Sequence, residues 1–383
     1  MKLLKIIVNN YKICDNDFTI SFIPNGNKTS VDKEFELLKI DEDLYTFSTL
    51  GIIGKNASGK TMTLELLAII YDIFSYFRIN NTKSLFKYID KPINLDITFY
   101  YEGCIYRYLT ELSKDNNSSL DDFIFFRNEK LFRRVYKKAH ARNLFDYDKF
   151  EELTFDIKLP LDTSLLYTLL KDIKLRGFYL PSDDYSYRDY FNAFNIYKLL
   201  DSNLKIITSL LKIFDEHLDN IVMVNEDKFI VHYRDKSIKE VSSYDLYRIL
   251  SSGTSKGFGL FTYVIYSLKS GTDLIIDEIE NHFHKTIVEN LVNLYKDKSV
   301  NTNNASLIFT THYCELLDLF NRSDNIYISK YEDKIKLENM HEKYKFRGEL
   351  SKSNKFYNNE FNTNVSYEAL MNFKKELIKE LVD

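Results

Sequence analysis

A glycine-rich segment at positions 54–61 has the residue types and spacing of a phosphate-binding loop. It reads Gly-Lys-Asn-Ala-Ser-Gly-Lys-Thr and matches the pattern G-x-x-x-x-G-K-[ST] in full. Glycines let such a backbone curl until successive N–H groups point inward, and the amino end of a following helix adds partial positive charge. We therefore expect this loop to bind a nucleoside triphosphate. The alternative is an ordinary glycine turn before a helix.

Two side chains of the loop are expected to have chemical roles of their own. Lys60 is expected to reach the β- and γ-phosphates, and the Thr61 hydroxyl is expected to ligate Mg²⁺. The other loop residues are expected to contact the nucleotide through the curled backbone. The candidate nucleotide-binding residues of the loop are Gly54, Lys55, Asn56, Ala57, Ser58, Gly59, Lys60 and Thr61.

A pair of carboxylates follows the apolar run 274–276. If that run is a core strand, Asp277 and Glu278 stand at its carboxyl end, where open α/β sheets bind their ligands. Asp277 is then expected to hold Mg²⁺, often through water, and Glu278 to orient and deprotonate an attacking water. The alternative is a strand-end turn without special chemistry. The position of the two carboxylates after a phosphate loop in the sequence favours a catalytic role.

Two further segments place polar residues at the expected ends of elements. Ser251 and Gly253 precede a helical pattern, which is typical of a helix cap and of an anion-binding site. His312 comes after the apolar run 306–309, where it is expected to hydrogen-bond a γ-phosphate or the catalytic carboxylate. The alternatives are a plain helix cap and a strand-end histidine without a special role.

The spacing of apolar residues predicts the elements that position these groups. Expected strands lie at 3–8, 18–22, 50–53, 95–101, 104–109, 123–126, 130–135, 228–233, 237–241, 274–276 and 306–309, with a hairpin turn at Glu102-Gly103. Expected helices lie at 62–70, 284–295, 314–320 and 367–381 and after Gly253, and 145–225 is expected to be mostly helical, above all 196–221. Helices that alternate with apolar strands predict an α/β fold.

The motifs divide the chain into three parts. Residues 1–75 and 245–335 are expected to form one nucleotide-binding core, with antiparallel strands at its N-terminal end. An insertion of hairpins and helices at 76–244 interrupts this core, and 336–383 is expected to be a C-terminal extension with one amphipathic helix. The length of 383 residues suits one large or two moderate domains.

Composition argues against several classes of protein. Lys and Arg number 52 and Asp and Glu 56, so the net charge of −4 does not by itself favour nucleic-acid binding. We find no run of eighteen apolar residues and no signal peptide, so we expect neither a membrane span nor secretion. Cys14, Cys104 and Cys314 lie too far apart to indicate disulfides or zinc, which favours a cytoplasmic location.

The order of the motifs carries a family resemblance. Asp277 follows Gly253 by 24 residues, and His312 follows Glu278 by 34. The series of phosphate loop, LSSGT, LIIDE and FTTH resembles the head of ABC-type ATPases, with its Walker A, signature, Walker B and switch-histidine motifs. The resemblance covers about 1–70 and 245–330. Within that class the chain looks like the stand-alone AAA-type ATPases of abortive-infection and toxin systems, which are similar to the SMC/RecF and OLD groups.

The resemblance implies a P-loop head that binds and hydrolyses ATP with Mg²⁺, working in phage defence, toxin systems or DNA maintenance. The implied catalytic residues are Glu278, His312 and Lys60. It also implies a head-to-tail homodimer, in which Ser251 and Gly253 of one subunit meet the γ-phosphate held by the other. A second hypothesis is a slow ATP-dependent scaffold or sensor that holds and releases a separate effector protein, a toxin or a nuclease.

The chain departs from the family pattern at several positions. It contains no glutamine, although the family normally uses one to contact Mg²⁺ and sense the γ-phosphate, and the segment 178–184 is where we look for a substitute. The signature reads LSSGT in place of LSGGQ, and His284 stands where ABC heads often have an aspartate. These departures concern communication between subunits more than nucleotide binding.

The insertion contains the densest basic stretch of the chain, interleaved with aromatic residues. A nucleic-acid-binding face is one interpretation, because Lys and Arg neutralise phosphates and aromatic rings stack on bases. The other, which we favour, is a solvated hairpin and helix whose aromatic rings face the core. The basic residues are Arg127, Lys130, Arg133, Arg134, Lys137, Lys138 and Arg142, and the aromatic ones are Phe125, Phe126, Phe132 and Tyr136.

Overall fold

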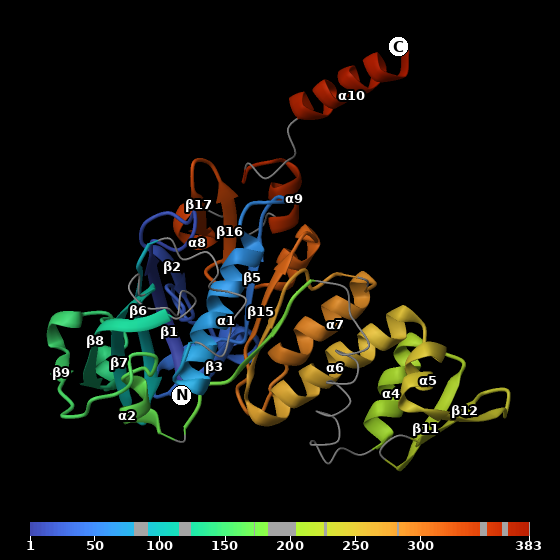
Figure 1. Cartoon of the computed structure of the whole chain (residues 1–383), viewed down its shortest axis with the longest axis horizontal. Coiled ribbons are helices and arrows are strands. Elements are labelled where there is room, and N and C mark those ends of the chain that lie inside the picture. Colours follow the sequence, from blue (N-terminus) through green and yellow to red (C-terminus); the bar gives the residue numbers. More distant parts are fainter. Residues whose placement is uncertain are drawn as a thin grey trace.

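A computed structural model of the chain places six strands in a central sheet (Figure 1). The described residues are 1–79, 91–114, 124–171, 173–182, 204–225, 228–281, 283–344, 351–361 and 367–382. The strands of the central sheet, in spatial order, are β10 (Gly177–Leu180), β14 (Asp273–Ile276), β15 (Leu307–Thr311), β5 (Thr49–Ile53), β16 (Ile326–Tyr331) and β17 (Ile335–Asn339). The first five run parallel, and β17 pairs antiparallel with β16 at one edge.

Neighbouring residues of the central strands point into two different hydrophobic cores. The helices that cover the sheet are α1 (Lys60–Tyr76), α6 (Ser252–Ser270) and α7 (Lys285–Lys296). Ile52 and Ile275 belong to the core that contains α1, whereas Ile53 and Ile276 belong to the core that contains α6 and α7. Because successive side chains of a strand point to opposite faces, α1 lies on one face of the sheet and α6 and α7 lie on the other. This layered arrangement confirms the expected α/β class.

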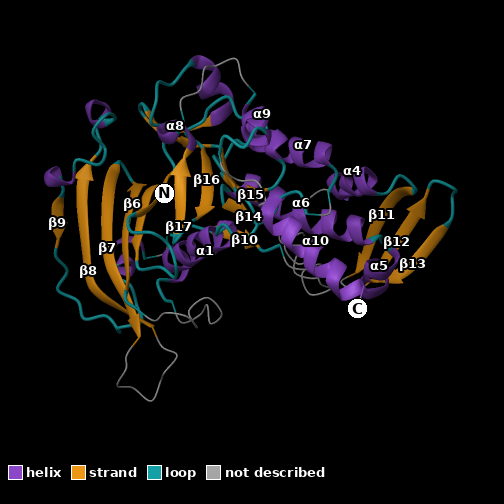
Figure 2. Ribbon diagram, turned by 90° about the horizontal axis from the view of Figure 1, so that it is seen from above, coloured by secondary structure: helices purple, strands orange, loops and turns teal. Residues whose placement is uncertain are grey.

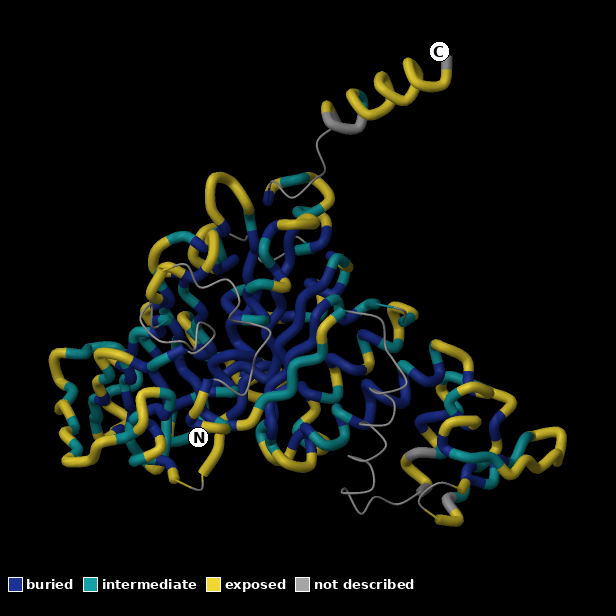
Figure 3. Tube along the Cα trace, in the orientation of Figure 1, coloured by how far each residue is buried: buried dark blue, intermediate teal, exposed yellow. Residues whose placement is uncertain are grey.

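Burial explains why the central strands are apolar along their whole length. All residues of β5, β14 and β15 are buried, and Figure 3 shows this buried interior through the middle of the molecule. A parallel sheet covered on both faces leaves no solvent side for polar residues. The predicted strands 50–53, 274–276 and 306–309 are therefore confirmed to within a residue or two.

A second, antiparallel sheet packs against α1 on the side that faces away from the central sheet. Its strands, in spatial order, are β2 (Phe18–Ser21), β1 (Lys2–Asn9), β6 (Ile93–Tyr101), β7 (Cys104–Lys114), β8 (Ile124–Val135) and β9 (Glu151–Leu153). Phe74 of α1 packs edge-on against Phe99 of β6, with ring centroids 5.1 Å apart. The expected hairpin turn at Glu102-Gly103 is present, with φ of 44° and 73°. The short hairpin of β3 (Leu37–Asp41) and β4 (Leu44–Phe47) leads into β5.

The prediction of two separate strands in 123–135 is wrong. The described part, 124–135, is the single strand β8, and both of its halves pair with β7. Leu109 lies opposite Lys130 and Glu111 lies opposite Arg127, so β8 has one more residue than its partner between these pairs. Asn128, with φ of 54°, is part of this bulge. A bulge interrupts the alternation of side chains, and the sequence pattern therefore looks like a turn.

A small lobe, defined here as residues 204–249 without the undescribed 226–227, lies at the opposite end of the molecule from the antiparallel sheet (Figure 2). It contains α4 (Leu204–Phe214), β11 (Leu218–Asn225), β12 (Lys228–Tyr233), β13 (Ile238–Ser242) and α5 (Ser243–Ile249). The hairpin predicted at 228–241 is confirmed. Phe214 of α4 packs against Phe261 of α6, with ring centroids 5.9 Å apart, so the lobe rests on α6.

The expectation that 145–225 is mostly helical is wrong for the described residues. They contain the strands β9, β10 and β11, and their only α-helices are the short α2 (Leu166–Leu170) and α4. Residues 218–221 belong to a strand because they pair with β12, and a short apolar run cannot be assigned by periodicity alone. Residues 196–203 of the predicted helix lie outside the described residues. The predicted helix 314–320 is a 3-10 helix, Cys314–Leu319.

The described residues after β17 contain three helices. They are α8 (Met340–Lys343), α9 (Lys352–Tyr357) and α10 (Tyr367–Val382). The predicted C-terminal helix 367–381 is thus confirmed as α10, which extends away from the body of the molecule (Figure 1). Among the described helices, none combines the length and the apolar character that a membrane crossing requires.

Candidate active site at the carboxyl edge of the central sheet

The glycine-rich segment 54–61 connects β5 to α1 through a tight turn that two glycines permit. Gly59, the residue before α1, has a φ of +100°, which L side chains rarely adopt. A Cβ atom on Gly54 would lie 2.4 Å from the carbonyl oxygen of Ser329, so the packing leaves room only for glycine. The turn leads straight into the amino end of α1, where a helix favours anions.

Lys60 is the first residue of α1, and its side chain is buried. Its Nζ donates hydrogen bonds to the carbonyl oxygens of Gly54 at 3.0 Å and Lys55 at 3.2 Å. Burial lowers the pKa of this ammonium, and nearby carboxylates, led by Glu278, oppose the shift. Within the described part of the chain, its hydrogen bonds go to carbonyls alone. A phosphate group in the turn would supply the missing counter-charge, so the residues present fit a triphosphate.

The Asp277 carboxylate lies against the start of α1. It is 2% exposed, and its Oδ2 accepts a hydrogen bond from Thr61 Oγ1 at 2.7 Å. A hydroxyl and a carboxylate that meet in this way are oxygen ligands of the kind that Mg²⁺ prefers. No three His, Cys, Asp or Glu side chains of the described residues are grouped to hold a metal ion. An Mg²⁺ ion here would therefore take its remaining ligands from phosphate and water, as is usual for Mg²⁺.

Glu278 and His312 stand at the ends of neighbouring strands, β14 and β15. The distance from His312 Nε2 to Glu278 Oε1 is 3.5 Å, and both side chains are partly exposed. Glu278 has a φ of 50°, an uncommon value for a residue with a side chain. Backbone of this kind concentrates at functional sites, where the surrounding structure enforces it. The pair can receive and hold a proton from a water molecule at the edge of the sheet.

Two residues that sequence reasoning missed join these strand ends. Thr310 Oγ1 donates to Asp277 Oδ1 at 2.6 Å and accepts from the Glu278 backbone N–H at 2.7 Å. Glu280 Oε1 accepts from the His312 backbone N–H at 2.5 Å. Thr310 and Glu280 therefore set the position of Glu278 relative to His312. A DEIE segment and a strand-end threonine are visible in the sequence, but only the pairing of β14 with β15 shows that they meet.

Ser251 and Gly253 are not brought to the phosphate loop within one chain. Ser251 caps α6, and its Oγ accepts a hydrogen bond from the Thr254 N–H at 3.0 Å. Ser251 is exposed, and a Cβ atom on Gly253 would meet only Ser251 Oγ, 3.8 Å away. Because α6 and α1 lie on opposite faces of the sheet, these residues form a separate surface. The described residues include no hydrogen bond or ion pair from Ser251 or Gly253 to the segment 54–61.

Comparison with known proteins places this geometry in a family. Residues 50–318, more than half of the chain, match the family described as "AAA domain, putative AbiEii toxin, Type IV TA system". The chain belongs to this family. It is thus a P-loop domain of the nucleotide-binding ATPase class, as the order of the motifs predicts. None of the curated proteins matches it.

Solved structures with a similar fold include two SMC heads. The SMC head domain from Thermotoga maritima is 10% identical, with a TM-score of 0.41, and the match covers 88% of this chain and 99% of that one. The SmcHead bound to the C-winged helix domain of ScpA is 12% identical, with a TM-score of 0.43, and the match covers 89% of this chain and 99% of that one.

In this AAA-domain protein, the segment 178–184, where we look for a substitute for the missing glutamine, begins beside β14. β10 pairs parallel with β14, so that Leu180 lies opposite Ile276. The Ser182 carbonyl accepts a hydrogen bond from Asn281 Nδ2 at 2.9 Å, which joins the end of β10 to the turn after β14. Asp183 and Asp184 of the predicted segment lie outside the described residues. His284 caps α7, and its Nδ1 accepts from the Thr286 N–H at 3.3 Å.

The basic stretch of the insertion runs along β8 and the turn after it. Phe126 and Tyr136 are buried, as the interpretation that we favour predicts, whereas Phe125 and Phe132 are only partly buried. Arg127 Nε donates to Ser113 Oγ at 2.8 Å, and Lys138 pairs with Glu42 at 2.8 Å. Part of this positive charge is thus used within the molecule. Nucleic-acid binding by this stretch stays a prediction.

Proposed function

We propose that the chain binds ATP with Mg²⁺ at the edge formed by the ends of β5, β14 and β15, and hydrolyses it to ADP and phosphate. One observation carries the proposal: three strand ends that are distant in sequence place complementary groups together. Thr61 contacts Asp277 at 2.7 Å, and His312 lies 3.5 Å from Glu278. Such a combination of cation, metal ligands and proton acceptor suits phosphoryl transfer to water.

The proposed roles follow from the surroundings of each side chain. Lys60 and the backbone of 54–61 hold the phosphates, because the buried ammonium forms no ion pair with the described residues and donates to two carbonyls. Thr61 and Asp277 hold Mg²⁺, which supplies neutralisation of phosphate charge when bound. Glu278 orients a water and accepts its proton, and His312 stabilises that carboxylate and the charge that develops next to it.

We also propose that the second half of the site comes from a second copy of the chain. In a head-to-tail dimer, Ser251 and Gly253 of one subunit would face the phosphates held by the other. Two observations support this arrangement. Both residues are at the accessible amino end of α6, and the fold separates them from the phosphate loop of their own chain. A helix amino end is a favourable partner for a phosphate anion.

The family description includes a putative toxin of a type IV system, and we therefore propose a role in phage defence or a related toxin system. A separate effector protein is the partner that such a role requires. The second candidate function is an ATP-dependent scaffold with slow turnover. The absence of glutamine from the whole chain favours slow turnover, because the residue that normally senses the γ-phosphate is missing.

The substitution Glu278→Gln tests the proposal, because it removes the proton acceptor and keeps the shape of the side chain. We expect ATP hydrolysis to fall by about 10² or more, while ATP still binds and the dimer accumulates. Phosphate release and light scattering after gel filtration measure the two effects. Glu332→Gln is the matched control, because Glu332 is exposed on the β16–β17 hairpin and its ion pair among the described residues is with Lys336.

Normal hydrolysis by Glu278→Gln would contradict the assignment of the catalytic residue. The same variant separates the two candidate functions. If the biological activity is lost together with turnover, hydrolysis is the function. If that activity survives in the trapped dimer, the scaffold is the function.

A further inference from the structure

A pocket lies at the edge of the central sheet opposite the candidate active site. Its volume is about 540 Å³, and its walls include Arg176, Thr272 and Asn304. These residues come just before β10, β14 and β15, whereas the phosphate loop and the catalytic pair come after parallel strands. The pocket therefore opens at the amino ends of the strands. It is separate from the site that the proposed function uses.

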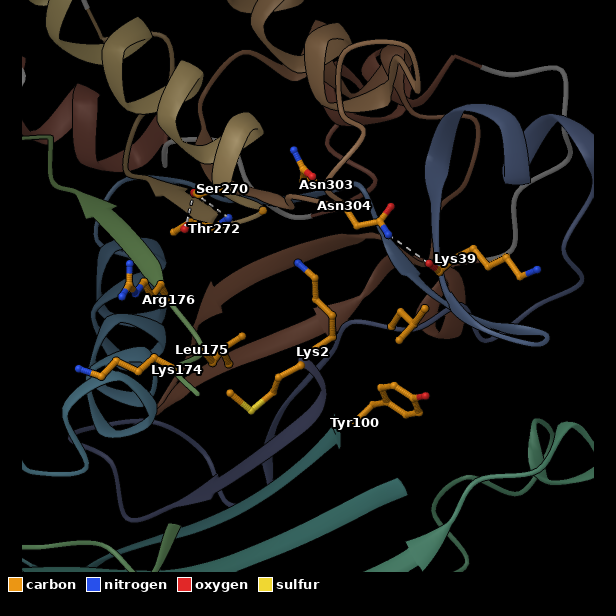
Figure 4. A pocket seen from close by; sticks show the side chains of 13 residues that line it. Lys2, Lys39, Tyr100, Lys174, Leu175, Arg176, Ser270, Thr272, Asn303 and Asn304 are labelled. Atoms are coloured by element: carbon orange, nitrogen blue, oxygen red, sulfur yellow. Dashed lines mark hydrogen bonds between the residues drawn. The ribbon is translucent and has the colours of Figure 1, made fainter. Parts of the chain in front are cut away.

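Every charged side chain that lines this pocket is a cation. Lys2, Lys39, Lys174 and Arg176 all contribute to the walls, and the thirteen lining residues include no Asp or Glu. Figure 4 shows Lys2 in the middle, with Lys174 and Arg176 on one side and Lys39 on the other. In a chain with a net charge of −4, this concentration of positive charge stands out against the average surface. Like charges in one pocket repel unless an anion joins them.

The carboxylate closest to Lys2 already has its partners. Asp273 is buried and accepts hydrogen bonds from Lys2 Nζ at 2.5 Å, Tyr71 Oη at 2.7 Å and the Ser306 N–H at 2.8 Å. Asp273 neutralises Lys2 and cannot serve the other cations. Within the described part of the chain, Lys39, Lys174 and Arg176 form no ion pair. These three cations of the wall thus have no ion-pair partner among the described residues, and Figure 4 shows the amino groups of Lys39 and Lys174 pointing away from the middle of the pocket.

The neutral polar residues of the pocket mostly stabilise its wall. Asn303 Nδ2 donates to the carbonyls of Leu268 and Lys269, each at 3.0 Å, and Asn304 Nδ2 donates to the Lys39 carbonyl at 3.2 Å. Both amide donors of Asn303 and one of those of Asn304 are thereby used. Recognition of a ligand falls to Lys39, Lys174 and Arg176, whose long and exposed side chains can turn toward it.

We propose that this pocket binds a small molecule that carries two or more phosphate groups. The volume is in the range of small-ligand sites, and a polar, cationic lining suits a polyanion rather than an apolar compound. Arg176 has the planar donor geometry that matches phosphate oxygens, and Lys39 and Lys174 add mobile point charges on either side. A volume of about 540 Å³ suits a compact ligand.

The test is a calorimetric titration of the full chain with inorganic tripolyphosphate, in a Lys60→Ala background that disables the proposed ATP site. We expect binding of one tripolyphosphate that Lys174→Glu with Arg176→Glu weakens by about tenfold or more, as expected for the loss of charge-assisted hydrogen bonds. Arg142→Glu is the matched control, since Arg142 is exposed and does not line the pocket. That control should change the affinity by less than about twofold, because distant exposed charges are screened.

Two results would overturn the proposal. One is the absence of tripolyphosphate binding to Lys60→Ala, and the other is binding that ignores the changes at Lys174 and Arg176. A single-stranded oligonucleotide serves as the competing probe. If it binds through Lys174 and Arg176 while tripolyphosphate does not, the pocket is part of a polymer-binding surface and the proposed ligand class is wrong. Thermal melting confirms that each variant is folded, and both substituted residues are exposed.

Discussion

The carboxyl edge of the central sheet and the amino end of α6 differ in how their functional groups are satisfied. At the sheet edge the groups contact one another: Thr61 meets Asp277, Thr310 bridges to Asp277, and Glu278 faces His312. At the start of α6, the hydrogen bonds of the Ser251 hydroxyl among the described residues go to Thr254 of the same helix. The lobe beside it leaves large apolar side chains exposed, and Ile238 is 62% accessible.

Under the proposed function, one chain assembles half of a nucleotide site, and the amino end of its α6 completes the site of a second copy. Parallel strands bring their carboxyl ends to one edge, so residues from 61 to 312 meet without a partner molecule. α6 lies on the other face of the same sheet, and the described residues include no hydrogen bond or ion pair from Ser251 or Gly253 to the segment 54–61. If the proposed function holds, substitutions in the two regions will have separable effects.

The largest effect is expected at the phosphate loop. Lys60→Ala should weaken ATP binding by about a hundredfold, because it removes a buried charge-assisted contact to phosphate. Isothermal titration with Mg-ATP measures the affinity. Lys55→Ala is the matched control, because the Lys55 side chain is exposed and only its carbonyl contacts Lys60. Equal affinity of both variants for ATP would remove the phosphate-loop assignment.

The second largest effect is expected at the amino end of α6. Ser251→Arg should stop ATP-driven dimerisation and lower turnover at least about tenfold, while the monomer binds ATP as before, because the bulky cation occupies the proposed interface. Light scattering with Mg-ATP measures the dimer. Ser242→Arg is the matched control. Ser242 caps α5 as Ser251 caps α6, so each variant loses a helix cap worth about 1 kcal/mol. A dimer that forms normally in Ser251→Arg would show that the α6 surface has no such role.

A smaller effect is expected from the residue that links the strand ends. Thr310→Val removes the hydrogen-bond partner of Asp277 Oδ1 and of the Glu278 N–H. It should therefore lower kcat about tenfold with little change in KM, and it should lower the free energy of unfolding by about 1–2 kcal/mol. Thr310→Ser keeps the hydroxyl and should restore both quantities. Urea unfolding and steady-state hydrolysis provide the measurements. A loss of stability with unchanged kcat would make Thr310 purely structural.

The smallest effect is expected from a titrating carboxyl on α1. Burial raises the pKa of Asp72 from 3.8 to about 6. The folded state therefore binds more protons than the unfolded state between these values, and stability falls as the pH rises through 6. Asp72→Asn should be more stable than the wild type by about 1 kcal/mol at pH 7, after allowance for partial exposure, and the difference should vanish near pH 4. Urea unfolding at both pH values measures the difference in stability between the variant and the wild type. The same difference at pH 4 and pH 7 would contradict the raised pKa of Asp72.

Local motifs allowed much of the fold and part of the candidate site to be predicted. A few consecutive residues are enough to predict each of three features. These are the phosphate loop, the apolar strands before Asp277 and His312, and the helix cap at Ser251. The errors have a common cause. The bulge at Asn128 and the pairing of 218–225 with β12 depend on a partner strand, and no local pattern shows which strand that is.

The sequence by itself determined the chemistry that is available: a lysine in a glycine turn, two carboxylates after an apolar run, a histidine after another. The tertiary structure alone decided which of these groups meet. Thr310 and Glu280 become linkers only because β14 and β15 are neighbours. Strand order likewise gathers cations from residues 2, 39, 174 and 176 at the opposite edge. The physical reason is that hydrogen bonds and ion pairs act over a few ångströms in space, and sequence separation does not measure that distance.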